Sequence, residues 1–354
     1  MKDLLRDSAT LVQRVRDDGA LPLIAEAERQ GMAGLLALRA GTKADPALMA
    51  LRRRLMLEED LRAAEMRRVV DALGSAGIRA VILKGSALAY THYPEPWCRT
   101  RADLDVLVAR AQRTAAGQVL RHLGYAPGDL VSGTWLMQQD LWERELTPDA
   151  MHMVDVHVEF TNRVFFATHF PASVGLAHAV PAPFAGPHGW QLDSADALIF
   201  SCVHRVAHHS GDARLVWSHD LALQAASCTA ADLVEVQRRA VSYGLAAICA
   251  HELQRARALW GGRSGAFADP VIDTLTAAGQ GEPSRAYLTG GRGPGGDLWL
   301  DLRALGSWRA RAQLIAEHLI PPRTFMRRQL GVTTRNLPWR YARRILTGSF
   351  RWSR

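Results

Sequence analysis

The chain has 354 residues, of which 48% are hydrophobic and 22% are charged, so it can bury a sizeable core and is not intrinsically disordered. Its formal net charge of +8 is uneven, because the last 34 residues hold nine arginines and no acidic residue, which leaves about −1 for the other 320. The charged N-terminus lacks the apolar core of a signal peptide and no apolar run reaches ~20 residues, which predicts a soluble cytoplasmic protein without a transmembrane segment.

Residues 1–75 are predicted to form a helical segment, because Leu48, Leu51 and Leu55 recur at helical spacing among charged residues. The chain then alternates short apolar runs with helical patterns. In order, we expect a strand, a helix, a strand, a helix and a strand over residues 79–83, 87–91, 103–108, 112–123 and 154–160. Residues 136–146 fit either a strand or a short helix. These patterns predict an α+β fold whose core, over 76–170, is a small mixed sheet with helices on one side.

The second half of the chain is predicted to be helical. Residues 171–187 are rich in Pro, Ala and Gly and are expected to form a connector. Helical patterns follow over residues 195–209, 217–226, 230–243, 246–259, 298–319 and 339–346. They predict a C-terminal helical domain over 188–320 and a basic tail over 321–354.

Two features beside the first predicted strands can carry chemistry. An apolar run ends in Lys84-Gly85-Ser86, and backbone N–H groups at the helix start that follows attract phosphate. Asp103 and Asp105 are two residues apart on a strand, so their carboxylates project from the same face. Adjacent carboxylates repel each other unless a cation lies between them, which predicts a site for one or two Mg²⁺ ions.

These residues resemble the signature of the DNA polymerase β-type nucleotidyltransferase superfamily, namely an apolar strand, Gly-Gly or Gly-Ser, a short helix and Asp-x-Asp on the next strand. More narrowly, the chain is similar to the bacterial branch labelled uncharacterised nucleotidyltransferase, in Leu83-Lys84-Gly85, Tyr93-Pro94, Arg99 and residues 103–108. The sixteen residues between Ser86 and Asp103 exceed the usual superfamily gap but are similar to this branch. The resemblance implies metal binding by the two aspartates and nucleotide contacts from Lys84, Gly85, Ser86 and Arg99.

The superfamily also has a third carboxylate on a neighbouring strand. Residues 154–160 alternate apolar and polar side chains, so Asp155, His157 and Glu159 share a face of the predicted strand. The branch has an acidic residue, an apolar residue and a histidine here, which match Asp155, Val156 and His157. The resemblance implies that Asp155 binds metal or accepts the proton of the attacking hydroxyl, and that His157 lines the pocket.

Four residues of the helical half match a further part of the branch pattern, which is a helix with a histidine, then Arg-x-x-Trp and an aspartate. They are His204, Arg214, Trp217 and Asp220. The resemblance allows them to contact nucleotide or acceptor, and a buried ion pair between Arg214 and Asp220 is an equal alternative. His204 and His208 have a spacing that can bind zinc, but without an HExxH motif a structural or pocket-lining pair is favoured.

The basic tail alternates arginines with aromatic residues. Such a segment can bind RNA by phosphate contacts and stacking, or seat an amphipathic helix on an anionic membrane. The favoured interpretation is a helix packed on the core with its arginines in solvent.

We therefore expect a nucleotidyltransferase that uses Mg²⁺ or Mn²⁺ to move a nucleoside monophosphate from an NTP to an acceptor hydroxyl. Two alternatives stay open: a catalytically silent nucleotide-binding scaffold, and a toxin-like enzyme that modifies RNA held by the tail. The resemblance permits a sugar, peptide, protein or RNA acceptor, including in polysaccharide or peptide natural-product assembly, and it does not choose the acceptor or the NTP.

Overall fold

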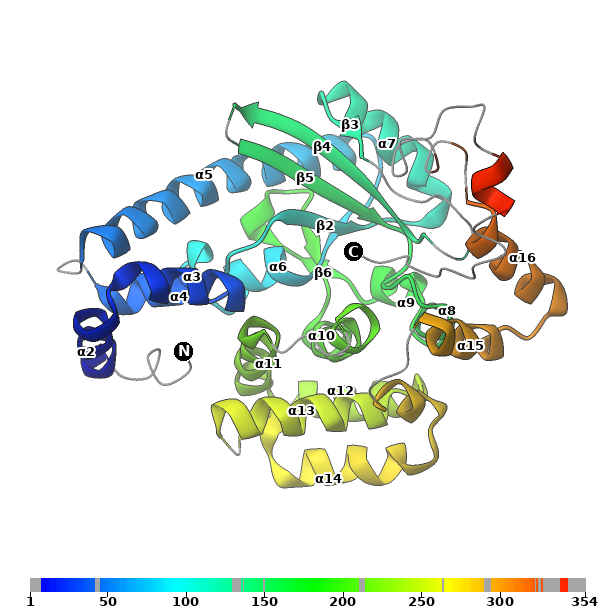
Figure 1. The fold of residues 1–354 in the computed structure, drawn as a ribbon. Coiled ribbons are helices and arrows are strands. Elements are labelled where there is room, and N and C mark those ends of the chain that lie inside the picture. The colour runs from blue at the N-terminus through cyan, green and yellow to red at the C-terminus, as the bar shows by residue number, and fades with distance from the viewer. Residues whose placement is uncertain are drawn as a thin grey trace.

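The computed structural model describes residues 8–41, 45–128, 135, 137–148, 150–209, 214–262, 264–289, 294–321, 323, 326 and 338–342. The N-terminal segment is helical, as predicted. Its helices α2, α3, α4 and α5 span Ser8–Asp18, Ala20–Gln30, Ala33–Ala40 and Pro46–Ser75. The start of α5 is fixed by Asp45, whose side chain accepts a hydrogen bond from the Ala47 N–H. This helix of 30 residues reaches from the N-terminal helices to the sheet (Figure 1).

A seven-stranded mixed sheet lies at the centre, in the order β3-β4-β5-β2-β1-β7-β6. In chain order, its strands β1 to β7 span Val81–Ile82, Asp103–Leu107, Ala126–Pro127, Gln139–Thr147, Ala150–His157, Val180–Pro181 and Trp190–Gln191. Strand β2 is parallel to β5 and β1 is parallel to β7, whereas the remaining pairs are antiparallel. The α+β prediction is confirmed, and the ambiguous segment 136–146 contributes to strand β4.

Helices cover both faces of the sheet, so the prediction of helices on one side only is wrong. Four further helices, α6 to α9, span Lys84–Thr91, Arg113–His122, Val164–His169 and Ala172–Ala177. One face carries Leu104, Val106, Val154 and Val156, which pack with apolar side chains of α5 and α7. On the other face, Leu83 and Leu107 join a large cluster with helix α10 (Figure 1). The acidic side chains of β2 alternate with the first set and therefore lie on the second face.

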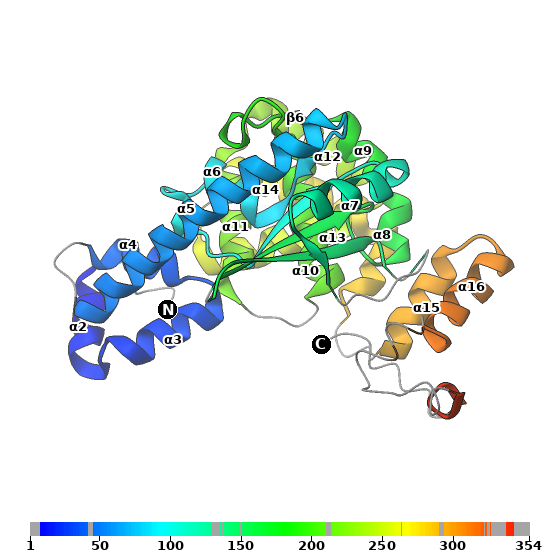
Figure 2. The ribbon, with the colours of Figure 1, turned by 90° about the horizontal axis from the view of Figure 1, so that it is seen from above.

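The C-terminal half is a helical layer, as predicted. Helices α10 to α16 span Ser194–His208, Leu215–Ser227, Ala230–Ser242, Ala246–Trp260, Asp269–Ala278, Pro294–Ala304 and Trp308–Leu319. Helices α10 and α11 lie next to the sheet, and α13 and α14 lie beyond them (Figure 1). Figure 2 shows α15 and α16 at the opposite end of the molecule from α2 and α3.

Several predictions for this half are corrected. The segment 171–187 is more than a connector, because it holds α9 and strand β6. The single helical pattern over 298–319 is two helices, separated by residues 305–307. Of the predicted helix over 339–346, residues 339–342 are helical, and most of the basic tail lies outside the described residues. Within the described residues, none of the helices is both long and apolar enough to cross a bilayer.

Candidate active site

The site is built on the two parallel strands β2 and β5. Their register places Asp105 directly beside Asp155 and Leu107 beside His157. Because paired residues of adjacent strands project from the same face, these polar side chains converge. Ligand atoms of Asp105, Asp155 and His157 lie within 4.8 Å of one another. The third aspartate, Asp103, precedes Asp105 by two residues on the same face.

Asp105 is the centre of this group and is only 4% exposed. Its Oδ1 accepts hydrogen bonds from Lys84 Nζ at 2.7 Å and from His157 Nε2 at 2.8 Å. Burial alone raises the pKa of a carboxyl group, but Lys84 and His157 outweigh this and lower the Asp105 pKa well below its usual range. Asp105 is therefore a buried carboxylate that is charged at neutral pH.

The other two aspartates are shifted in the opposite direction. The negative charge of Asp105, together with burial, raises the pKa of Asp103 to about 6. Burial, and then the charges of Asp105 and Asp103, raise the pKa of Asp155 to about 7. Asp155 Oδ2 accepts a hydrogen bond from Gln139 Nε2 at 3.2 Å, whereas its buried Oδ1 has no hydrogen-bond partner among the described residues. Repelling carboxylates with an unsatisfied buried oxygen fit a divalent cation.

The turn between β1 and α6 lies beside these carboxylates. Lys84 has a positive φ of 48°, which lets the chain leave β1 and start α6 at once. The Leu83 N–H donates to the Asp105 carbonyl at 3.0 Å, and Ser86 Oγ donates to the Asp103 carbonyl at 3.3 Å. The N-terminal end of α6 is thereby held against β2, where its backbone N–H groups can receive a phosphate.

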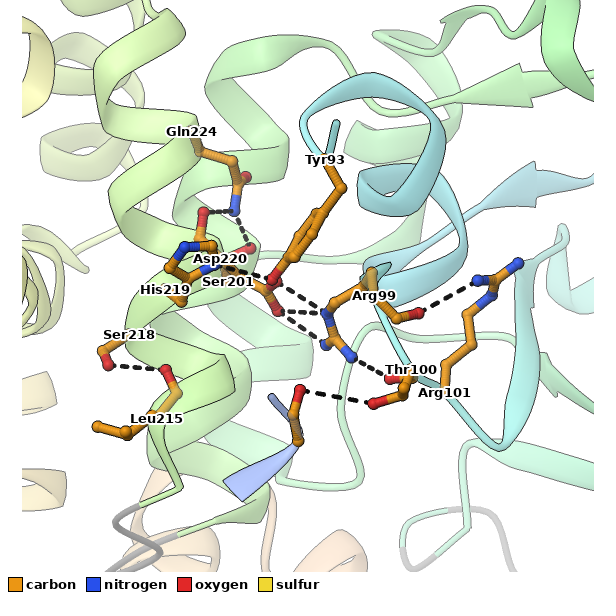
Figure 3. A network of polar contacts seen from close by, with 11 residues as sticks. Tyr93, Arg99, Thr100, Arg101, Ser201, Leu215, Ser218, His219, Asp220 and Gln224 are labelled. Carbon is orange, nitrogen blue, oxygen red and sulfur yellow. Dashed lines mark hydrogen bonds and ion pairs between the residues drawn. The ribbon is translucent and has the colours of Figure 1, made fainter. Parts of the chain in front are cut away.

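Arg99 connects this turn to the helical half. A Cβ at Gly85 would lie 3.4 Å from Arg99 Cζ, so the guanidinium packs on the turn. The same guanidinium donates to both carboxylate oxygens of Asp220 on α11, with two bonds of 2.8 Å from Nε and Nη2 (Figure 3). Tyr93 Oη donates to the same carboxylate at 2.7 Å. One of the two alternatives for Asp220 is an ion pair with Arg214, but the described hydrogen bonds of this carboxylate come from Arg99 and Tyr93.

The remaining predicted site residues lie on α10 and at the start of α11. His204 is buried, 5.2 Å from the His208 ring and 5.5 Å from the Trp217 ring between centroids. Arg214 Cζ lies 5.0 Å from the Trp217 ring centroid. Burial, followed by the nearby charge of Lys84, lowers the pKa of both histidines well below the usual value. Both imidazoles are therefore neutral, and the groups of described residues able to hold a metal ion include neither of them.

The comparisons with known proteins agree with this arrangement. The model of the family described as uncharacterised nucleotidyltransferase matches residues 19–261, which is more than half of the chain. The chain belongs to this family. No curated protein matches it. The matched range holds the whole acidic cluster, the Lys84 turn and the Arg99–Asp220 pair.

Sequence reasoning missed four contacts in this candidate site. Gln139 reaches Asp155 from β4, a segment whose pattern fitted strand or helix equally. The direct contacts of Lys84 and His157 with Asp105 were not predicted, although their positions on adjoining elements are consistent with them. Tyr93 was quoted only as part of the family pattern, and its bond to Asp220 spans 127 residues of sequence. A pattern read along the chain contains no signal for contacts of that range.

Proposed function

We propose that the protein is a metal-dependent nucleotidyltransferase that moves a nucleoside monophosphate from an NTP to an acceptor hydroxyl. The observation that carries this proposal is the alignment of Asp105 with Asp155 beside the turn at the start of α6. It supports a cation site and a phosphate site next to each other. Membership of the nucleotidyltransferase family supports the same reaction class.

Asp103, Asp105 and Asp155 are the residues we assign to a Mg²⁺ or Mn²⁺ ion, with His157 beside them. When bound, such an ion would supply positive charge for the triphosphate and the leaving pyrophosphate. The Gly85-Ser86 backbone at the start of α6 is assigned to the phosphates. Arg99 keeps this turn in place through Asp220, which makes it a positioning residue for the nucleotide.

The acceptor hydroxyl must lose its proton as it attacks the α-phosphate. As the alternative to holding the ion, Asp155 accepts this proton, because its Oδ1 has no hydrogen-bond partner among the described residues and lies in the cluster with Asp105. The bond from the hydroxyl oxygen to phosphorus then forms, and the bond from phosphorus to the pyrophosphate oxygen breaks. We assign His204 on α10, and Arg214 and Asp220 at the start of α11 and within it, to the positioning of the substrate.

The test follows label from an α-³²P-labelled NTP, with Mg²⁺ or Mn²⁺, into acceptors present in a cell extract. We expect transfer by the wild type and a loss of at least about 100-fold in Asp105→Asn, because a buried charge facing the phosphates is removed. The matched control is Asp140→Asn on the adjacent strand β4. Asp140 faces α7, where it pairs with Arg113, so this variant should keep its activity. Equal transfer by the wild type and Asp105→Asn would refute the proposal, and so would tight NTP binding by the wild type with no transfer.

A further inference from the structure

Helix α16 presents an apolar stripe to solvent. Trp308, Ala312 and Ile315 lie at positions i, i+4 and i+7, so their side chains share one face of the helix. Trp308 is 73% exposed, Ile315 is 39% exposed, and Ala312 is exposed as well. The helix packs on the protein through a different face, where Leu314 is buried in a cluster with Leu305. Single exposed apolar side chains are ordinary on a protein surface, but a continuous stripe of them marks an interaction site.

Further exposed apolar side chains lie at the C-terminal end of α16. Ile320 follows the helix directly and is exposed. Tyr341 Oη donates a hydrogen bond to the Pro321 carbonyl at 2.5 Å, which holds the helical residues 338–342 beside this end of α16 (Figure 1). Among the described residues, the tryptophans that are more than half exposed all belong to this part of the chain, namely Trp299, Trp308 and Trp339.

The exposed charges around this apolar surface are all positive. Among the described residues of 294–342, the exposed charged side chains are those of Arg303, Arg309, Arg311, Arg323 and Arg340. The acidic side chains of the same range are less exposed and have partners. Asp297 and Asp301 pair with Arg163, and Glu317 accepts a hydrogen bond from the Trp135 N–H. An apolar surface surrounded by arginines, without an exposed acid, complements an anionic partner.

The charges and the side chains together indicate which partner this is. A second copy of the chain would bring the same arginines to the surface, and the chain's own basic tail is also positive, so both would be repelled. Arg309 Cζ lies 5.6 Å from the Trp308 ring centroid, which puts positive charge directly beside the stripe. RNA is anionic, but Ile315 and Ile320 have no ring on which a base could stack. A helix with an apolar face beside arginines is suited to the interface of an anionic bilayer, where tryptophan is also favoured.

We propose that α16 and residues 338–342 bind an anionic lipid bilayer. Trp308, Ile315 and Ile320 enter the headgroup region, and the surrounding arginines contact the lipid phosphates. Figure 2 shows α16 at one end of the molecule. The helix also lies outside the family match, which ends at residue 261. The inference therefore goes beyond the proposed function and does not rest on it.

Flotation with lipid vesicles tests this inference on the full chain. One set of vesicles is made of phosphatidylcholine, and the other contains phosphatidylcholine and phosphatidylglycerol in equal parts. We expect the wild type to bind the anionic vesicles at least about 10-fold more tightly, because several arginines near the surface are attracted to it. Equal binding to both kinds of vesicle, or binding to neither, would overturn the inference.

The apolar stripe is tested by Trp308→Gln combined with Ile315→Gln, which should weaken binding to the anionic vesicles by at least about 10-fold. The matched control is Leu21→Gln combined with Leu57→Gln. These leucines are 70% and 65% exposed on α3 and α5, and the control should bind like the wild type. All four side chains are exposed, so neither change removes core packing. If the stripe variant binds as tightly as the wild type, another part of the chain holds the vesicle and the inference fails.

The charge is tested by Arg303→Gln combined with Arg309→Gln, two exposed side chains. We expect about 10-fold weaker binding to the anionic vesicles, since each arginine near an anionic surface adds to the attraction. Unchanged binding would contradict the assigned contacts with lipid phosphates. Poly(U) RNA separates the two anionic partners. RNA binding that the stripe variant loses, without vesicle binding by the wild type, would assign the surface to nucleic acid instead.

Discussion

Lys84 combines an uncommon backbone conformation with a central electrostatic contact. Its φ of 48° is in the left-handed region, which is disfavoured for a residue with a side chain by roughly 1–2 kcal/mol. Gly85 follows it directly, yet the lysine and not the glycine adopts this conformation. This backbone conformation places the Lys84 ammonium group against Asp105, where a cation would neutralise that carboxylate. The ammonium group is thus positioned to compete with the proposed divalent ion for the charge of Asp105.

This competition gives a prediction for Lys84→Met. The variant should bind Mn²⁺ several-fold more tightly than the wild type in the absence of nucleotide, because Asp105 loses the ammonium that neutralises it. Electron paramagnetic resonance titration of free Mn²⁺ measures this without any activity assay. Lys84→Arg keeps the charge and serves as the control, with affinity near that of the wild type. Equal or weaker binding by Lys84→Met would show that the lysine does not compete with the ion.

At the scale of elements, the pair of Arg99 and Asp220 joins the segment after α6 to α11. Both side chains are about 6% exposed, and the geometry is bidentate. Burial disfavours charge on Arg99, but the adjacent Asp220 carboxylate outweighs it and raises the pKa of the guanidinium above its usual range. A buried ion pair adds little net stability compared with apolar residues, but breaking it leaves an unpaired buried charge.

Asp220→Asn is accordingly expected to lower the free energy of unfolding by about 3–5 kcal/mol, because the Arg99 guanidinium loses its counter-charge in a buried place. The matched control is Asp18→Asn, which breaks the exposed pair of Arg14 and Asp18 and should change stability by less than about 1 kcal/mol. Urea denaturation followed by circular dichroism measures both values. Similar small losses for the two variants would mean that the Arg99 pair does not hold the elements together.

The strands and their contacts also show which parts of the fold a sequence pattern can predict. Alternation of apolar and acidic residues over 103–108 and 154–160 predicts two strands with one apolar face, because a period of two is visible in six or seven residues. Both strands are present, but the second spans Ala150–His157, so Glu159 lies beyond its end. Strands β3, β6 and β7 have two residues each, and no period can be read from so short a run. The register that aligns Asp105 with Asp155 depends on tertiary packing. So does the contact between Arg99 and Asp220, which are 121 residues apart in the sequence. The types of the site residues are therefore predictable, whereas their partners are not.

At the scale of the whole molecule, the hydrophobic clusters do not follow the segments of the chain. The largest one contains Val81, Leu83 and Leu107 of the sheet region together with side chains of α10 to α14. Another joins α3, α4 and α5 to residues 93–98 and to Val216 on α11. The predicted boundaries at 75 and 170 therefore cross shared cores. A segment taken out of this structure would expose apolar surface on more than one side.

From this we predict that the full chain unfolds in one cooperative transition. In differential scanning calorimetry, the calorimetric enthalpy should equal the van't Hoff enthalpy, because the sheet cannot keep its second face packed once α10 and α11 separate from it. The isolated fragment 76–170 should lack the near-ultraviolet circular dichroism of a packed core, because Phe160, Phe165, Phe166 and Phe170 would lose the helices that bury them. Two resolved transitions in the full chain, or a folded fragment, would instead make the nucleotidyltransferase core an independent domain. In that case the helical half could move relative to the carboxylates, and Arg99 with Asp220 would mark the contact that opens.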